Sequence, residues 1–158
     1  MTGRAGRAPL AGALLAAPLW AAAMAAPVLE VVATDGTVLA SLPLGAERGF
    51  CLHWNHSVTG GPVADCFRAE AAGLVLESSY QHDFAAGLGH LPGRGVQQAA
   101  EGGGYRIEGI DAPVPGGTLA LRVGGAAVGH RIEAAGRTLD LTALAAGQRV
   151  TLRAAGLP

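Results

Sequence analysis

The residues of this chain best suited to chemistry are concentrated in one stretch, residues 50–67, which reads FCLHWNHSVTGGPVADCF. It holds two histidines, two cysteines, a serine and an aspartate around a Gly-Gly-Pro turn. Imidazole and thiolate groups are preferred ligands of zinc, a serine beside a histidine raises the question of a nucleophile and its base, and two cysteines can form a disulfide. Each possibility depends on how the backbone directs these side chains.

The two histidines of this stretch are expected on opposite faces of one strand. Large apolar residues alternate with other residues from Phe50 to Asn55, which is the period of a half-buried strand. His53 and His56 are three positions apart, so they share a zinc ion only if a bulge intervenes. We therefore predict no metal site here.

Ser57 directly follows His56, but neighbouring strand residues point apart, so His56 is badly placed to act as its base. The chain also lacks the Gly-x-Ser-x-Gly sequence of a nucleophile elbow. We expect no enzymatic activity. A purely structural role remains open for both side chains, which can bond to the backbone at a strand end.

Cys51 and Cys66 are the only cysteines, and an even count in an exported protein favours a disulfide. Two registers of the hairpin remain open. A turn centred on Gly60-Gly61 places Cys51 opposite residue 70, which is too far from Cys66 for a bond. A turn centred on Val58-Thr59 places the cysteines opposite each other, although neither residue suits a tight primed turn.

The N-terminal residues have the pattern of a secretory signal peptide. Arg4 and Arg7 precede an uncharged, alanine-rich run from Ala8 to Ala26 that ends in small residues. Prolines interrupt the run and no charged flank follows it. We expect residues 1–26 to be removed on export to the periplasm, with a retained membrane anchor as the alternative.

The remaining residues, 27–158, are expected to form a single domain. They carry 9 arginines and 12 acidic residues, a net charge of −3, which does not suit a nucleic-acid partner. About 130 residues are enough for one core. Because aromatic residues are scarce, that core should consist mainly of Leu, Val, Ile and Ala.

Short alternating runs bounded by glycine or proline indicate an all-β domain. Asp35-Gly36 suits the tight turn of a first hairpin, and the stretch around Gly60-Gly61 connects a second. The runs TLALRV, RTLDLT and RVTLRA alternate with the period of two that strands require. We predict an antiparallel β-sandwich or partly closed β-barrel built from short hairpins, with one helical turn ended by Gly147 and no long helix after the signal peptide.

Three further features are candidates for binding. The sequence FAAGLGHLP, residues 84–92, is a long glycine-rich loop, and such loops are more often functional than plain connections, although it can also simply cover an open end of the sheet. His130 shares a strand face with Ile132, as a core histidine or a polar group in a pocket. Arg106 and Arg122 are expected to face solvent, with carboxylate binding as the alternative.

Residues 50–155 resemble the family known as domain of unknown function 1850, which consists of small exported bacterial proteins. The most specific pieces are His56-Ser57-Val58, the loop at residues 84–92 and the histidine near the C-terminal hairpin, His130. Two departures stand out. Thr59 replaces a glutamate that is usual after His-Ser-Val, and the loop has Ala85 and an inserted Gly89-His90.

The resemblance implies a context more than a reaction. Members of the family are typically encoded beside the solute-binding protein and the permease of a TAXI-type TRAP transporter, a carrier of carboxylate-like solutes. We therefore expect a periplasmic accessory protein that binds the solute-binding protein, the permease or a small carboxylate ligand. The alternative is a free-standing protein that binds a small ligand or a metal.

The expected binding surface combines the end of the His56 strand, the glycine-rich loop and the C-terminal hairpin. Asp65 supplies the acidic residue that the family has after the turn. The predicted binding residues are His56, Ser57, Asp65, Gly87, Gly89, Pro92 and His130, and no cofactor is expected.

Overall fold

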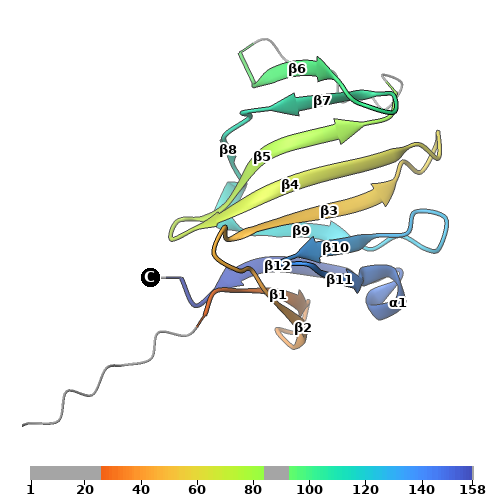
Figure 1. The fold of residues 1–158 in the computed structure, drawn as a ribbon. Helices are drawn as coiled ribbons and strands as arrows, with labels where there is room; N and C mark the ends of the chain where they lie inside the picture. The colour runs from red at the N-terminus through yellow and green to blue at the C-terminus, as the bar shows by residue number, and fades with distance from the viewer. Residues whose placement is uncertain (1–25, 84–92, 158) are drawn as a thin grey trace, which may run out of the picture.

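The computed structural model describes residues 26–83 and 93–157 of the 158-residue chain. The expected signal peptide, apart from Ala26, lies outside the described residues, as do Gly87, Gly89 and Pro92 of the predicted site. Two antiparallel β-sheets pack face to face and do not close into a barrel (Figure 1). The prediction of an all-β, sandwich-like domain is therefore confirmed.

The smaller sheet has four strands in the order β2-β1-β12-β9. Its strands are β1 (Val28–Ala33), β2 (Val38–Pro43), β9 (Leu119–Arg122) and β12 (Arg149–Ala155). The first hairpin turns at Asp35-Gly36 as expected, because the Asp35 carboxylate accepts the Thr37 N–H and Gly36 takes a φ of 89°.

The larger sheet has eight strands in the order β11-β10-β3-β4-β5-β7-β6, with β8 beside β5. Its strands are β3 (Gly49–Asn55), β4 (Pro62–Glu70), β5 (Gly73–Gln81), β6 (Val96–Ala99), β7 (Tyr105–Glu108), β8 (Ala112–Pro113), β10 (Arg131–Ala134) and β11 (Arg137–Asp140). In Figure 1, β6 and β7 form the edge farthest from the smaller sheet.

The main core lies between the smaller sheet and strands β10, β3 and β4. Alternation fills it from both sides: Leu29 and Val31 on β1 face Phe50 and Leu52 on β3, and all four are at most 5 % exposed. Aliphatic residues dominate, as expected from the scarcity of aromatics. The side of the larger sheet that faces this core is called the inner face below, and the opposite side the outer face.

The predicted helical turn is α1 (Leu141–Ala145), which follows β11. The Asp140 carboxylate caps it by accepting the Ala143 N–H at 2.8 Å, and Gly147 follows its end with a φ of 78°. A short 3-10 turn, η2 (Pro115–Gly117), precedes β9. Within the described residues no helix is long and apolar enough to cross a membrane.

The β3–β4 hairpin decides between the two registers that the sequence left open. Asn55 pairs with Pro62, so the connection is residues 56–61, centred on Val58-Thr59, and Cys51 lies opposite Cys66 in a disulfide. The register centred on Gly60-Gly61 is wrong. A tight primed turn is not needed, because the six-residue connection is closed by its own bonds from His56 N–H to Gly61 O and from Gly60 N–H to His56 O, both 2.8 Å.

Candidate functional site

The predicted residues His56 and Ser57 lie in the β3–β4 loop, residues 56–61, at one end of the larger sheet. His56 Nδ1 accepts the N–H of Thr59 at 3.2 Å and lies 3.3 Å from its hydroxyl oxygen. That hydroxyl also accepts the Gly61 N–H at 3.3 Å, which gives Thr59 a role in shaping the loop. His56 therefore stabilises the turn, whereas the side chain of Ser57 is exposed and makes no hydrogen bond to a described residue.

His130 is placed at the same end of the sheet, directly before β10. Its Nδ1 accepts the N–H of Gly124 at 3.0 Å, its own N–H donates to the Thr142 hydroxyl at 2.8 Å, and its ring stacks on Trp54. Burial lowers the pKa of His130. These contacts make His130 a neutral, structural residue that joins the preceding loop to α1.

The structure brings His56 and His130 to one end of the sheet but records no direct contact between them within the described residues. The link runs through the backbone, because the Asn55 N–H donates to Val128 O at 2.7 Å. The predicted common surface therefore has two anchored histidines, and Ser57 is its exposed polar member.

Asp65 faces elsewhere, because its position on β4 directs it to the inner face, opposite Ser79 of β5. Burial raises the pKa of the Asp65 carboxyl, while the Ser79 hydroxyl and the charge of Arg94 oppose that rise. Asp65 is thus a costly buried acid inside the sheet and not part of the surface around His56.

A trough on the outer face begins beside these loops and has a volume of about 510 Å³, within the range of small-molecule sites. Six of its lining residues form one continuous cross-strand row, each directly opposite the next in the strand register. The row consists of Arg131, His53, Ala64, Tyr80, Arg106 and Gln98, from β10, β3, β4, β5, β7 and β6 in that order. Ala64 has the shortest side chain of the row, which leaves the middle of the trough open.

Arg106 is held over the Tyr80 ring, with its guanidinium carbon 5.9 Å from the ring centroid. The Tyr80 hydroxyl donates to the carbonyl of Gly103 at 3.1 Å, which ties the trough to the β6–β7 turn. Gly104 in this turn has a φ of 76°, and a Cβ there would collide with the backbone of Gln81 and His82. The platform under Arg106 is therefore fixed by neighbouring strands.

The two ends of the row differ in how their charges are satisfied. At the β10 end, Glu133 lies 3.4 Å from both Arg131 Nε and His53 Nε2. The contact between His53 Nε2 and Glu133 lacks hydrogen-bond geometry, so the buried Nε2 atom has no hydrogen-bond partner among the described residues. Burial lowers the pKa of His53, and the negative charge of Glu133 only partly opposes this shift. At the β7 end, Arg106 makes no ion pair with any residue that the structure describes.

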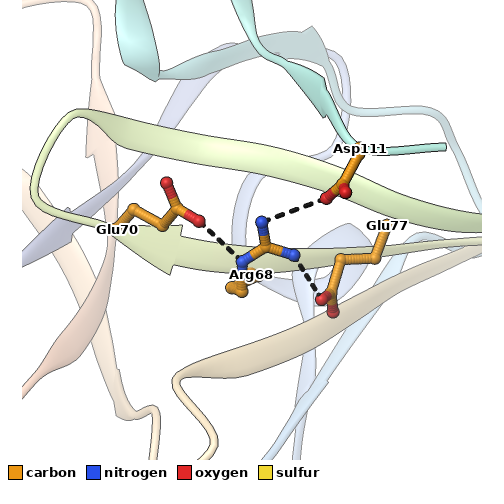
Figure 2. A network of polar contacts seen from close by, with 4 residues as sticks. All are labelled: Arg68, Glu70, Glu77 and Asp111. Atoms are coloured by element: carbon orange, nitrogen blue, oxygen red, sulfur yellow. Dashed lines mark hydrogen bonds and ion pairs between the residues drawn. The ribbon is translucent and has the colours of Figure 1, made fainter. Parts of the chain in front are cut away.

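A second arginine on the outer face is fully satisfied. Figure 2 shows Arg68 among three carboxylates: its Nε lies 2.7 Å from Glu70, its Nη1 2.6 Å from Glu77 and its Nη2 3.1 Å from Asp111. These contacts raise the pKa of Arg68, and the hydrogen bond to Glu77 contributes most. All three nitrogens of Arg68 face a carboxylate, so this cluster joins β4 and β5 to the segment before β8.

Among the described residues no group of three or more histidines, cysteines, aspartates or glutamates is arranged to hold a metal ion, and both cysteines are in the disulfide. The trough contains Arg106 and Glu108, which make no ion pair with a described residue, and sequence reasoning did not assemble this site. The one sequence feature that pointed to the trough is Arg106, which alternates with the buried Tyr105 and Ile107. The other residues of the row come together only through the register of strands that are far apart in the sequence.

Comparison with protein families finds a match to the family described as Domain of unknown function (DUF1850), over residues 50–141. The matched residues include the β3–β4 loop, Asp65, every residue of the cross-strand row and His130. Comparison with curated proteins and with solved structures finds no match.

Proposed function

This chain belongs to the DUF1850 family, and we propose that it is a periplasmic accessory protein of a TAXI-type TRAP transporter. In this proposal it acts by binding and not by catalysis. Its ligand is a small carboxylate-bearing solute that occupies the outer trough. Its protein partner is the solute-binding protein or the permease of the transporter.

One observation carries the ligand part of the proposal: Arg106 is held in the trough and makes no ion pair with any described residue. A guanidinium presents two parallel N–H groups that match a carboxylate. Tyr80 holds Arg106 from one side, so little side-chain freedom is lost when an anion binds. The family context of carboxylate transport supports the same ligand class.

The trough also suits a small solute in its shape. It crosses β10, β3, β4, β5, β7 and β6, and its middle is lined by Ala64 and the ring of Tyr80. The polar groups stand at its ends, with Arg106 and Gln98 at one and Arg131 at the other. A short chain bearing a carboxylate therefore has an ionic contact at one end and apolar surface beyond it.

Titration of the ¹⁵N-labelled protein with butyrate, followed by amide NMR shifts, tests the ligand class. We expect shifts confined to residues around the trough and their loss in Arg106→Gln. Arg122→Gln is the matched control, because Arg122 is an exposed arginine on β9 of the other sheet. If no shifts occur, or if Arg106→Gln responds like the wild type, the carboxylate site is overturned.

Solute uptake by cells that carry the TRAP system tests the partner. Deletion of this protein should reduce uptake, and the full-length chain should restore it. Ser57→Ala should lower uptake without a change in thermal stability, because the Ser57 side chain is exposed and makes no hydrogen bond to a described residue. Uptake unaffected by the deletion contradicts the accessory role and leaves a free-standing binding protein, provided that the butyrate titration succeeds.

A further inference from the structure

We infer that the ligand of the trough is a zwitterion, an amino-carboxylate whose carboxylate binds Arg106 and whose ammonium group binds Glu108. This inference rests on the proposed function, because it concerns the same site. It adds a second charged contact of opposite sign and so narrows the class of solute.

Arg106 and Glu108 are a pair of opposite charges that β7 displays side by side. Both line the trough, and they are two positions apart on the same strand face, so their Cα atoms are roughly 7 Å apart. Neither makes an ion pair with a described residue, nor with each other. A cation and an anion are therefore both available to a ligand over the span of a short amino acid.

The surroundings of this pair favour a zwitterion over a plain anion. Glu101, at the β6–β7 turn, also lines the trough and adds a second negative charge at that end. Gln98 lies directly opposite Arg106 and offers both a donor and an acceptor. A ligand with only a carboxylate gains Arg106 but is repelled by Glu101 and Glu108, whereas an added ammonium group converts that repulsion into attraction.

The opposite end of the row does not offer the same pair. Arg131 and His53 share the carboxylate of Glu133 at 3.4 Å, so the charges there already face each other. The ionic head of the ligand therefore belongs at the β7 end, and its remainder extends over Tyr80 and Ala64 toward β3.

Three probes of matched chain length test the inference: 4-aminobutyrate, butyrate and butylamine, titrated into the full chain by NMR or calorimetry. We expect 4-aminobutyrate to bind about tenfold more tightly than butyrate, the worth of one charge-assisted contact. Glu108→Gln should bring 4-aminobutyrate down to the affinity of butyrate and leave butyrate no weaker. The control, Glu47→Gln, removes an exposed carboxylate outside the trough and should change neither.

The outcomes separate the inference from the function on which it rests. Equal affinities for 4-aminobutyrate and butyrate, both lost in Arg106→Gln, overturn the zwitterion and leave the carboxylate site standing. Binding of butylamine as tight as that of 4-aminobutyrate removes the role of Arg106 and overturns both. The absence of binding by any of the three probes also overturns both.

Discussion

Two arginines on the outer face of one sheet have opposite surroundings. Arg68 meets a carboxylate at each of its three nitrogens (Figure 2), whereas Arg106 rests on an aromatic ring and meets no carboxylate among the described residues. Both lie within strands, Arg68 on β4 and Arg106 on β7, and neither is buried. The two arginines differ in their neighbours, because the strand register and the segment before β8 bring carboxylates to Arg68 but not to Arg106.

This difference distinguishes a structural charge from an available one. The bonds of Arg68 are already made, so a ligand would have to displace a carboxylate to reach it. Arg106 is positioned but has no counter-charge among the residues that the structure describes, which is the state expected of a group that binds an anion from solution. Charge alone does not indicate a binding site, and the decisive property is whether the fold supplies the counter-charge.

The largest effect is expected from the disulfide, which joins β3 to β4 and whose Cys66 lies on β4 between Ala64 of the trough and Arg68 of the cluster. The double substitution of Cys51 and Cys66 by serine should lower the free energy of unfolding by about 3 kcal/mol, because it frees a loop of 15 residues in the unfolded chain. Urea unfolding measures this, with reduced wild type as the parallel sample. An unchanged midpoint contradicts a stabilising bond.

The next effect distinguishes the two arginines by stability. Arg68→Gln leaves Glu70, Glu77 and Asp111 close together without a cation, so we expect a melting temperature lower by a few degrees. Arg106→Gln breaks no ion pair with a described residue and should melt close to the wild type. Calorimetry of both variants in low salt checks the order. Equal losses would show that Arg106 is structural as well.

A smaller effect is expected on the pH dependence of the free energy of unfolding. Of the two regions compared, only the trough contains a histidine, His53, because the Arg68 cluster has none. Burial lowers the pKa of His53 and His130 below the value of 6.5 that each has when unfolded. Below that value the unfolded chain binds more protons than the folded one, so the free energy of unfolding falls as the pH drops from about 7 to 5.

Urea unfolding across that pH range measures the effect. His53→Gln should flatten the curve, since it removes the group that Glu133 and Arg131 face across β3 and β10. Arg68→Gln should leave the slope unchanged. A stability that rises on acidification through this range in the Asp65→Asn variant, where the raised pKa of Asp65 cannot cause it, contradicts the assignment of both histidines as partly buried and neutral.

The smallest expected effect is at Asp65, the predicted site residue on the inner face. Its pKa is raised by burial, so at neutral pH the folded state carries the cost of a desolvated carboxylate. Asp65→Asn should therefore unfold at a slightly higher urea concentration at pH 7 and close to the wild type below about pH 3.8. A clear loss of stability at pH 7 would mean that Arg94 and Ser79 outweigh burial.

Much of the fold followed from local patterns in the sequence. Alternation and glycine boundaries predicted the hairpin at Asp35-Gly36, the strand pair around the cysteines and the helical turn before Gly147, because these features are set by neighbouring residues. The short β6 and β8 were not predicted. VQQA and AP carry almost no hydrophobic period, and they become strands only by pairing with β7 and β5.

The candidate site was less predictable for the same reason. Residue types suggested His56 and His130 as binding groups, yet hydrogen bonds to Thr59 and Gly124 give both a structural task. The trough depends on which residues lie opposite one another across six strands. One wrong assumption about the centre of the β3–β4 turn shifts His53 away from Ala64, and the row is lost.

Affinity for butyrate, measured side by side on Arg106→Gln and Arg68→Gln at a temperature where both are folded, tests the central claim most directly. We predict that Arg106→Gln loses at least about tenfold in affinity and that Arg68→Gln binds like the wild type. Equal affinities in the two variants, or a loss confined to Arg68→Gln, would contradict the account of the trough as the binding site.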